Sequence, residues 1–249
     1  MTSLDDAAPI DQMVPIDAAP LPVDAPASTI DAPPAGPTPV ARWRFESNLD
    51  DDTNNHDAIV VGTAPSYVAG PSGNAVRFAA NGHLRIADSS RLDLPSGRIE
   101  LRYRFSASSP AGDLGLFSRD ANGTSLPGHV GIRIGHDRRL VARIQNTSGE
   151  AYRCTQSPIA PDTWHTVELR FGPAGLVLRQ DGATVSGTSW TNSDGGVHSC
   201  TTAWTGGIDG NDNPIVLGAL TLFSAEGEGT TAFPATGVDL DDVALWADP

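Results

Sequence analysis

Two adjacent aspartates, Asp241 and Asp242, stand inside an apolar stretch near the carboxyl end of the chain. Residues 237–246 predict a β-strand because their side chains alternate between two faces, with Leu240, Asp242, Ala244 and Trp246 on one and Asp241, Val243 and Leu245 on the other. Carboxylates in such a strand are costly unless a cation or a set of backbone N–H donors compensates them. The strand is therefore the first candidate for a binding site.

Two tryptophans and a histidine form a second candidate, in the stretch 184–213 where no alternation lasts. We expect this stretch to be a long surface loop. Exposed indoles stack on sugar rings, so Trp190, Trp204 and His198 are candidate ligand-binding residues. The alternative is that both tryptophans cover the core beside a disulfide.

A third candidate is an array of outward-facing arginines on neighbouring predicted strands. Forked guanidiniums on one face hold carboxylated or sulfated glycans in bidentate fashion. The alternative is ordinary cross-strand pairing with Glu100 and Glu168. The array comprises Arg102 and Arg104, which we take as ligand-binding candidates, together with Arg133, Arg143, Arg170 and Arg179.

Strands must position all of these residues, because no amphipathic helix is evident. In residues 99–105 the apolar side chains Ile99, Leu101, Tyr103 and Phe105 alternate with Glu100, Arg102 and Arg104. An opening strand places Trp43 and Phe45 inward. Further strands are predicted at 114–118, 130–134, 140–144, 167–171, 176–178, 215–217 and 220–223, separated by turn residues. The fold class is therefore all-β, an antiparallel two-sheet sandwich.

Four stretches occur in an order typical of a known family. These are GPSGNAVRF at 70–78 with residues 81–86, IELRYRF at 99–105, residues 164–182, and the closing run Gly-Val-Asp-Leu-Asp-Asp-Val-x-x-Trp. Over residues 41–248 the chain resembles the concanavalin A-like, laminin G-like family. The resemblance implies a jelly-roll sandwich. It also implies one structural calcium, held by Asp241 and backbone carbonyls, with Glu46 as a further ligand. The alternative is that arginines and backbone amides satisfy both carboxylates.

The acidic loop 48–57 also invites a calcium interpretation, but it lacks the glycine and the terminal glutamate of an EF-hand. We expect a solvated turn there.

Catalytic patterns are missing from the sequence. β-Glucanases built on the same sandwich carry Glu-x-Asp-x-x-Glu on one strand, and none of the six glutamates forms that pattern. No Gly-x-Ser-x-Gly turn occurs, and the six histidines show no metal-ligand spacing. We therefore predict that the chain is not an enzyme, and we rank a degenerate glycosidase last among its possible functions.

The formal net charge of -14 favours solubility and disfavours nucleic acid or anionic lipid as partners. No apolar run reaches the roughly 18 residues that a membrane span needs. The start of the chain has neither a basic region nor an apolar core, so we expect no signal peptide within it. The two cysteines, Cys154 and Cys200, predict one disulfide rather than free thiols or a zinc site, and hence an extracytoplasmic location.

Residues 1–39 repeat Ile/Val-Asp-Ala-Pro units without any aromatic residue, and we expect a disordered tether before a sandwich domain at 40–249. Such tracts resemble the spacers of bacterial envelope lipoproteins. A second interpretation pairs the isolated Ile and Val side chains with a sheet edge or another subunit.

Taken together, these features predict a non-catalytic extracytoplasmic recognition module, displayed on a tether, that binds carbohydrate or a surface protein. The alternative is a structural subunit of a cell-surface assembly, which would associate with copies of itself.

Overall fold

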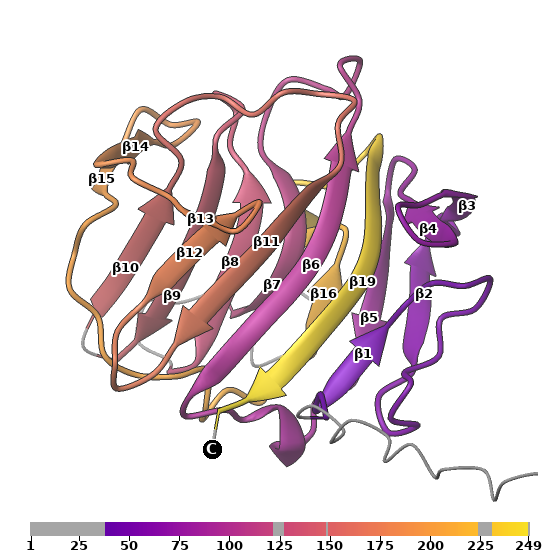
Figure 1. Ribbon diagram of the computed structural model, residues 1–249, viewed down its shortest axis with the longest axis horizontal. Coiled ribbons are helices and arrows are strands. Elements are labelled where there is room, and N and C mark those ends of the chain that lie inside the picture. The colour runs from indigo at the N-terminus through magenta and orange to yellow at the C-terminus, as the bar shows by residue number, and fades with distance from the viewer. Residues whose placement is uncertain (1–37, 122–126, 148, 224–230, 249) are drawn as a thin grey trace, which may run out of the picture. The chain divides into compact units, whose positions relative to one another are not determined.

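The computed structural model describes residues 38–121, 127–147, 149–223 and 231–248, and Figure 1 shows two facing sheets within them. The predicted all-β sandwich is confirmed. The predicted tether, residues 1–39, lies almost wholly outside the described residues.

The first sheet has eight strands within the described part of the chain. Its order is β13 (Ala183–Thr184), β12 (Val177–Gln180), β11 (His165–Phe171), β6 (Gly97–Phe105), β19 (Val238–Ala247), β4 (Asn74–Arg77) and β3 (Ser66–Ala69), with β1 (Ala41–Trp43) also paired to β19. In Figure 1, β6 and β19 run side by side through the middle of this sheet.

The second sheet has nine strands in the same described ranges. Its order is β10 (Gly149–Cys154), β9 (Leu140–Asn146), β8 (His129–Ile134), β7 (Leu114–Ala121), β16 (Ile215–Leu217), β5 (Gly82–Ile86) and β2 (Ala58–Gly62), with β17 (Leu220–Phe223) and β18 (Thr231–Ala232) at its side. The pairing of β17 with β7 is parallel, which departs from the antiparallel expectation. One short 3-10 helix, η1 (Ser90–Leu92), precedes β6.

The core lies between the two sheets and is built as the alternation predicted. Strand β6 buries Ile99, Leu101, Tyr103 and Phe105 to 1 % exposure or less, while its charged residues face outward. Trp43 and Phe45 are fully buried, as predicted for the opening strand. Burying one such aromatic or aliphatic side chain contributes about 1.5–3 kcal/mol, so the inward rows supply the main stabilisation.

The closing strand β19 departs from simple alternation. Its register with β6 shifts between Asp241 and Ala244, and Asp242 adopts a left-handed conformation with φ of 50°. This β-bulge adds a residue and reverses the phase of the strand. Leu240, Val243 and Leu245 therefore all join the core, and the predicted face shared by Leu240, Ala244 and Trp246 is wrong.

The stretch expected to be a long loop contains a two-stranded hairpin, β14 (Ser189–Thr191) and β15 (Val197–Ser199). The predicted disulfide between Cys154 and Cys200 is present and ties the end of β15 to β10. The alternation of Trp190 with its neighbours was too short to be recognised in the sequence, because the strand has three residues.

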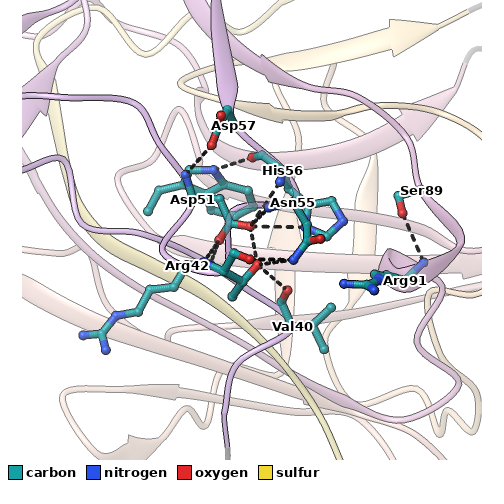
Figure 2. A network of polar contacts seen from close by, with 10 residues as sticks. Val40, Arg42, Asp51, Asn55, His56, Asp57, Ser89 and Arg91 are labelled. Atoms are coloured by element: carbon teal, nitrogen blue, oxygen red, sulfur yellow. Dashed lines mark hydrogen bonds and ion pairs between the residues drawn. The ribbon is translucent and has the colours of Figure 1, made fainter.

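The acidic loop 48–57 is a turn whose side chains are mostly exposed, as expected, but it is organised around one buried carboxylate (Figure 2). Asp51 is 1 % exposed and accepts the backbone N–H groups of Arg42 at 2.7 Å, Thr53 at 3.1 Å, Asn55 at 3.3 Å and His56 at 3.1 Å. Burial raises the pKa of Asp51, but the hydrogen bonds from Thr53 and the backbone outweigh it and hold that pKa below its usual value. Asp51 thus joins the loop to the opening strand.

Replacing Asp51 with alanine should lower the free energy of unfolding by about 3 kcal/mol, because it leaves several buried N–H donors without an acceptor. Urea denaturation measures this loss. The neighbouring change Asp52→Ala is the control, since its pair with Arg44 is at the surface and should cost about 0.5 kcal/mol or less. Equal losses in the two variants would contradict the role given to Asp51.

Candidate functional site

The outer face of the eight-stranded sheet carries two polar rows that run across the strands. In the first row Arg179, Glu168, Glu100, Ala244 and Arg42 are successive register partners on β12, β11, β6, β19 and β1. In the second row Thr166 and Asp241 flank Arg102 on β6. Because side chains alternate along every strand, these positions all point away from the core.

A hollow of about 330 Å³ opens between these rows. It exists because Ala244 and Thr166 are short and Gly182 has no side chain, whereas long side chains stand around them. Trp246, two residues beyond Ala244 on β19, contributes an indole to the lining, and the guanidinium of Arg98 lies 4.5 Å from that ring. The remaining lining residues are Arg42, Glu100, Leu101, Arg102, Val167, Glu168, Arg179 and Asp242.

Most charges around the hollow are paired. Arg42 donates to Asp242 at 2.6–2.7 Å, and Glu168 accepts from both Arg170 and Arg179 at 2.8–2.9 Å. The hydrogen bond from Arg170, together with the charges of Arg170 and Arg179, outweighs burial and lowers the pKa of Glu168. The predicted cross-strand pairing with Glu168 is therefore present for Arg179, whereas Arg170 pairs with Glu168 along the same strand, β11.

Glu100 and Glu168 are direct register partners on neighbouring strands, an arrangement that a glycosidase needs. Their surroundings are unsuited to that reaction. Glu100 accepts a hydrogen bond from Arg98 at 2.7 Å, and the pKa of Glu168 is lowered, whereas a general acid needs a raised pKa. The pair therefore acts as the acceptor side of an ion-pair network.

Arg104 lines a second hollow of about 300 Å³ with Arg77, Ser106, Ser108, Asp162, Gly237 and Asp239. Its guanidinium and that of Arg77 both hold the carboxylate of Asp239, at 2.6–2.9 Å, and Asp239 is only 1 % exposed. The ring of Trp164 lies 4.9 Å from Arg104. Arg104 is therefore held in an ion pair with the buried Asp239, and it does not line the hollow that Arg102 lines.

Two members of the predicted array belong to the other sheet. Arg133 on β8 lies 4.4 Å from the Trp190 ring and 3.6 Å from Asp113, and Arg143 on β9 pairs with Glu150 at 3.0 Å. The prediction of a single arginine face is therefore wrong. Sequence alternation shows which residues face outward, but it does not assign a strand to one of two sheets.

Both candidate indoles are buried, which confirms the alternative that the two tryptophans cover the core. Trp190 is 1 % exposed and packs with Tyr152 and the two cysteines in a small cluster, and Trp204 is 8 % exposed in the main core. His198 stacks on Trp190 at 5.6 Å, whereas Trp204 belongs to a different cluster. The premise of sugar stacking on these two tryptophans is therefore wrong, because the disulfide-tied hairpin turns Trp190 inward.

Asp241 and Glu46 lie beside one turn, residues 70–74, which begins the motif GPSGNAVRF. A Cβ on Gly70 would stand 2.9 Å from Asp241 Oδ2 and 3.1 Å from the Asn74 carbonyl oxygen, and a Cβ on Gly73 would stand 2.2 Å from Glu46 Oε1. Glu46 also accepts the N–H of Asn74 at 2.9 Å. The two glycines therefore leave room for two carboxylates and a backbone carbonyl beside this turn.

The carboxylate of Asp241 is buried and only partly compensated, because burial raises its pKa by more than either the charge of Arg102 or the backbone N–H of Asp242 lowers it. Asp241 is 1 % exposed, and its Oδ2 has no hydrogen-bond partner among the described residues. Burial, and next the charge of Asp242, raise the pKa of Asp241 to about 6. No cluster of three or more acidic, histidine or cysteine side chains suited to a metal occurs in the described ranges, so a cation here would need carbonyl oxygens too. Calcium accepts such mixed oxygen ligands.

Solved structures match this fold at low sequence identity. Domain 4 of AbnA, a GH43 extracellular arabinanase from Geobacillus stearothermophilus in complex with arabinotriose, is 11% identical over 84% of this chain and 92% of its own, with a TM-score of 0.51. The binding domain of botulinum neurotoxin DC in complex with SialylT is 12% identical over 84% of this chain and 47% of that chain, with a TM-score of 0.53. The present chain thus spans about half the length of that domain.

Neither a protein-family model nor a curated protein matches the sequence. The structural likenesses define the class of the fold, a two-sheet β-sandwich. Membership of the concanavalin A-like, laminin G-like family stays a prediction. Within the described residues, no helix has the length and apolar character of a membrane span.

The raised pKa of Asp241 predicts an unusual pH dependence in the presence of a chelator. The folded state holds this proton up to about pH 6, whereas the unfolded state releases it near pH 4, so the stabilisation present at low pH is lost as the pH rises. The free energy of unfolding of the wild type, relative to Asp241→Asn, should fall by about 2 kcal/mol from pH 4 to pH 7. Urea denaturation of both proteins across this range measures the difference, and parallel profiles would contradict the assignment.

Proposed function

We propose that this domain is a non-catalytic carbohydrate-binding module and that the sugar occupies the hollow bordered by Arg102, Thr166 and Trp246. The observation that carries the proposal is this hollow itself. It combines forked polar groups, a hydroxyl and an indole in a space of about 330 Å³, which suits a small oligosaccharide.

The chemistry of the lining supports a sugar ligand. Carboxylates and guanidiniums fixed in a network present acceptors and donors at set positions, and neighbouring hydroxyls of a sugar pair with both kinds. Because the residues stand on paired strands, little conformational entropy is lost when a ligand binds. The structural neighbours solved with arabinotriose and SialylT add support from proteins of the same fold class.

The setting we propose is extracytoplasmic. The disulfide between Cys154 and Cys200 is stable in an oxidising compartment, and glycan ligands are encountered there. In this proposal the segment 1–39 serves as the tether that displays the domain.

We also propose one structural calcium at the turn 70–74, with Asp241, Glu46 and backbone carbonyl oxygens as its ligands. The Oδ2 of Asp241, which has no hydrogen-bond partner among the described residues, and the closeness of Glu46 support it. A bound cation would neutralise the buried carboxylate and tie the turn to the closing strand. Its role is structural, since no step of a reaction is assigned to this site.

Filling the hollow should abolish sugar binding. The double variant Thr166→Met/Ala244→Met places two flexible side chains into the space, and its affinity for any glycan that the wild type binds should fall at least tenfold. A glycan array identifies the ligand, and isothermal titration calorimetry measures the affinity. Thr202→Met, at an exposed position outside the hollow, is the matched control and should bind as the wild type does. Unchanged affinity in the double variant, with near-UV circular dichroism intact, would refute this location.

Calcium should raise the melting temperature of the wild type by several degrees relative to EDTA, because binding to the folded state adds stability. The Asp241→Asn variant should lose this response yet melt no lower than the wild type in EDTA, since it removes a buried charge that is only partly compensated. Differential scanning calorimetry measures both effects. Magnesium serves as the control cation, because it demands a stricter octahedral geometry. A wild-type melting temperature that calcium leaves unchanged would contradict the proposed calcium site.

A further inference from the structure

The strands of the eight-stranded sheet are rich in arginine compared with the sequence as a whole. The whole sequence has 16 basic against 30 acidic residues. The strands of this sheet reverse that ratio, with seven arginines against five carboxylates within the described residues. The arginines are Arg42, Arg77, Arg98, Arg102, Arg104, Arg170 and Arg179, and the carboxylates are Glu100, Glu168, Asp239, Asp241 and Asp242.

The described strands of the nine-stranded sheet show a similar bias, with Arg85, Arg119, Arg133, Arg143 and Arg153 against Asp120 and Glu150. The number of arginines therefore does not distinguish one face from the other. What distinguishes a site is how each arginine is paired.

Arg102 is the lining arginine whose donors are least used. Arg42 and Arg179 each hold a carboxylate within 3.0 Å, whereas Arg102 approaches Asp242 Oδ2 only to 3.9 Å. Asp242 already accepts both the Nε and an Nη of Arg42 through its other oxygen. The Arg102 side chain is 36% exposed and stands at the centre of the second row, beside Thr166. Its planar fork therefore has donors to offer a ligand.

We propose that the hollow binds a glycan carrying a carboxylate, which the guanidinium of Arg102 holds in bidentate fashion. This inference rests on the proposed carbohydrate-binding function and names its ligand class. The planar fork of arginine matches the two oxygens of a carboxylate, and the Thr166 hydroxyl and Trp246 indole contact the remaining sugar. The paired network of Glu100, Glu168 and Asp242 accepts hydrogen bonds from sugar hydroxyls and disfavours a second negative charge.

Matched glycans test the proposal. Isothermal titration calorimetry compares trigalacturonic acid with its methyl ester, and 3′-sialyllactose with lactose, on the full chain. In at least one pair the carboxylated member should bind wild type at least tenfold more tightly than its neutral counterpart, and added salt should narrow the gap. The Arg102→Gln variant should bring the two members to within about twofold. Arg102→Lys, which keeps the charge but loses the fork, should fall between.

Each contrary result has a distinct meaning. Binding of neutral glycans without any preference for the acids would overturn the ligand class and leave the carbohydrate-binding function intact. A preference that survives Arg102→Gln would overturn the role of Arg102, and 3′-sulfolactose binding more tightly than 3′-sialyllactose would overturn the carboxylate in favour of a sulfate. Absence of binding to every glycan on a broad array would overturn both proposals. Arg91→Gln, an exposed arginine outside the hollow, is the control and should keep the wild-type preference.

Discussion

The backbone pairing of β19 with β6, β4 and β1 is the constraint on which the rest of the molecule depends. It closes the eight-stranded sheet and decides which side chains of four strands face the core. The bulge at Asp241 and Asp242 lets Leu240, Val243 and Leu245 all enter that core. The same shift places Ala244 and Trp246 on the outer surface, where they help to form the hollow. One irregularity in hydrogen bonding thus serves both the packing and the candidate site.

Three buried carboxylates differ in how the energetic cost of burying their negative charge is offset. Asp51 accepts four backbone N–H groups, and Asp239 is held by two guanidiniums. Asp241 has an oxygen without any partner among the described residues, and its pKa is raised to about 6. Because burying a charge is costly, the first two carboxylates stabilise local structure only through their partners. The third carboxylate has an oxygen without a hydrogen-bond partner among the described residues, and this distinguishes a candidate cation site from two carboxylates that protein groups satisfy.

Ion pairing also organises the polar outer face of the eight-stranded sheet. Most of its arginines and carboxylates form ion pairs with one another. These pairs hold the side chains in place and leave little net charge exposed. Such a network presents rigid donors and acceptors to a ligand, and it explains why the facing pair Glu100 and Glu168 is unsuited to acid catalysis. Arg102 stands out because its nearest carboxylate is farther away than those of its neighbours. How the charges are paired, rather than which residues are present, thus sets the properties of this face.

The sequence by itself determined the fold class, the inward rows of β6 and the disulfide, because period-two alternation and an even cysteine count are local or compositional signals. It also indicated that Asp241 and Glu46 belong together, through the order of motifs that resemble a family. It did not separate the arginines of the two sheets, nor show that Trp190 and Trp204 are buried. Those features, and the hollow beside Arg102, were decided only by the tertiary structure. The physical reason is that sheet assignment, bulges and cross-strand neighbours depend on contacts between residues far apart in the chain.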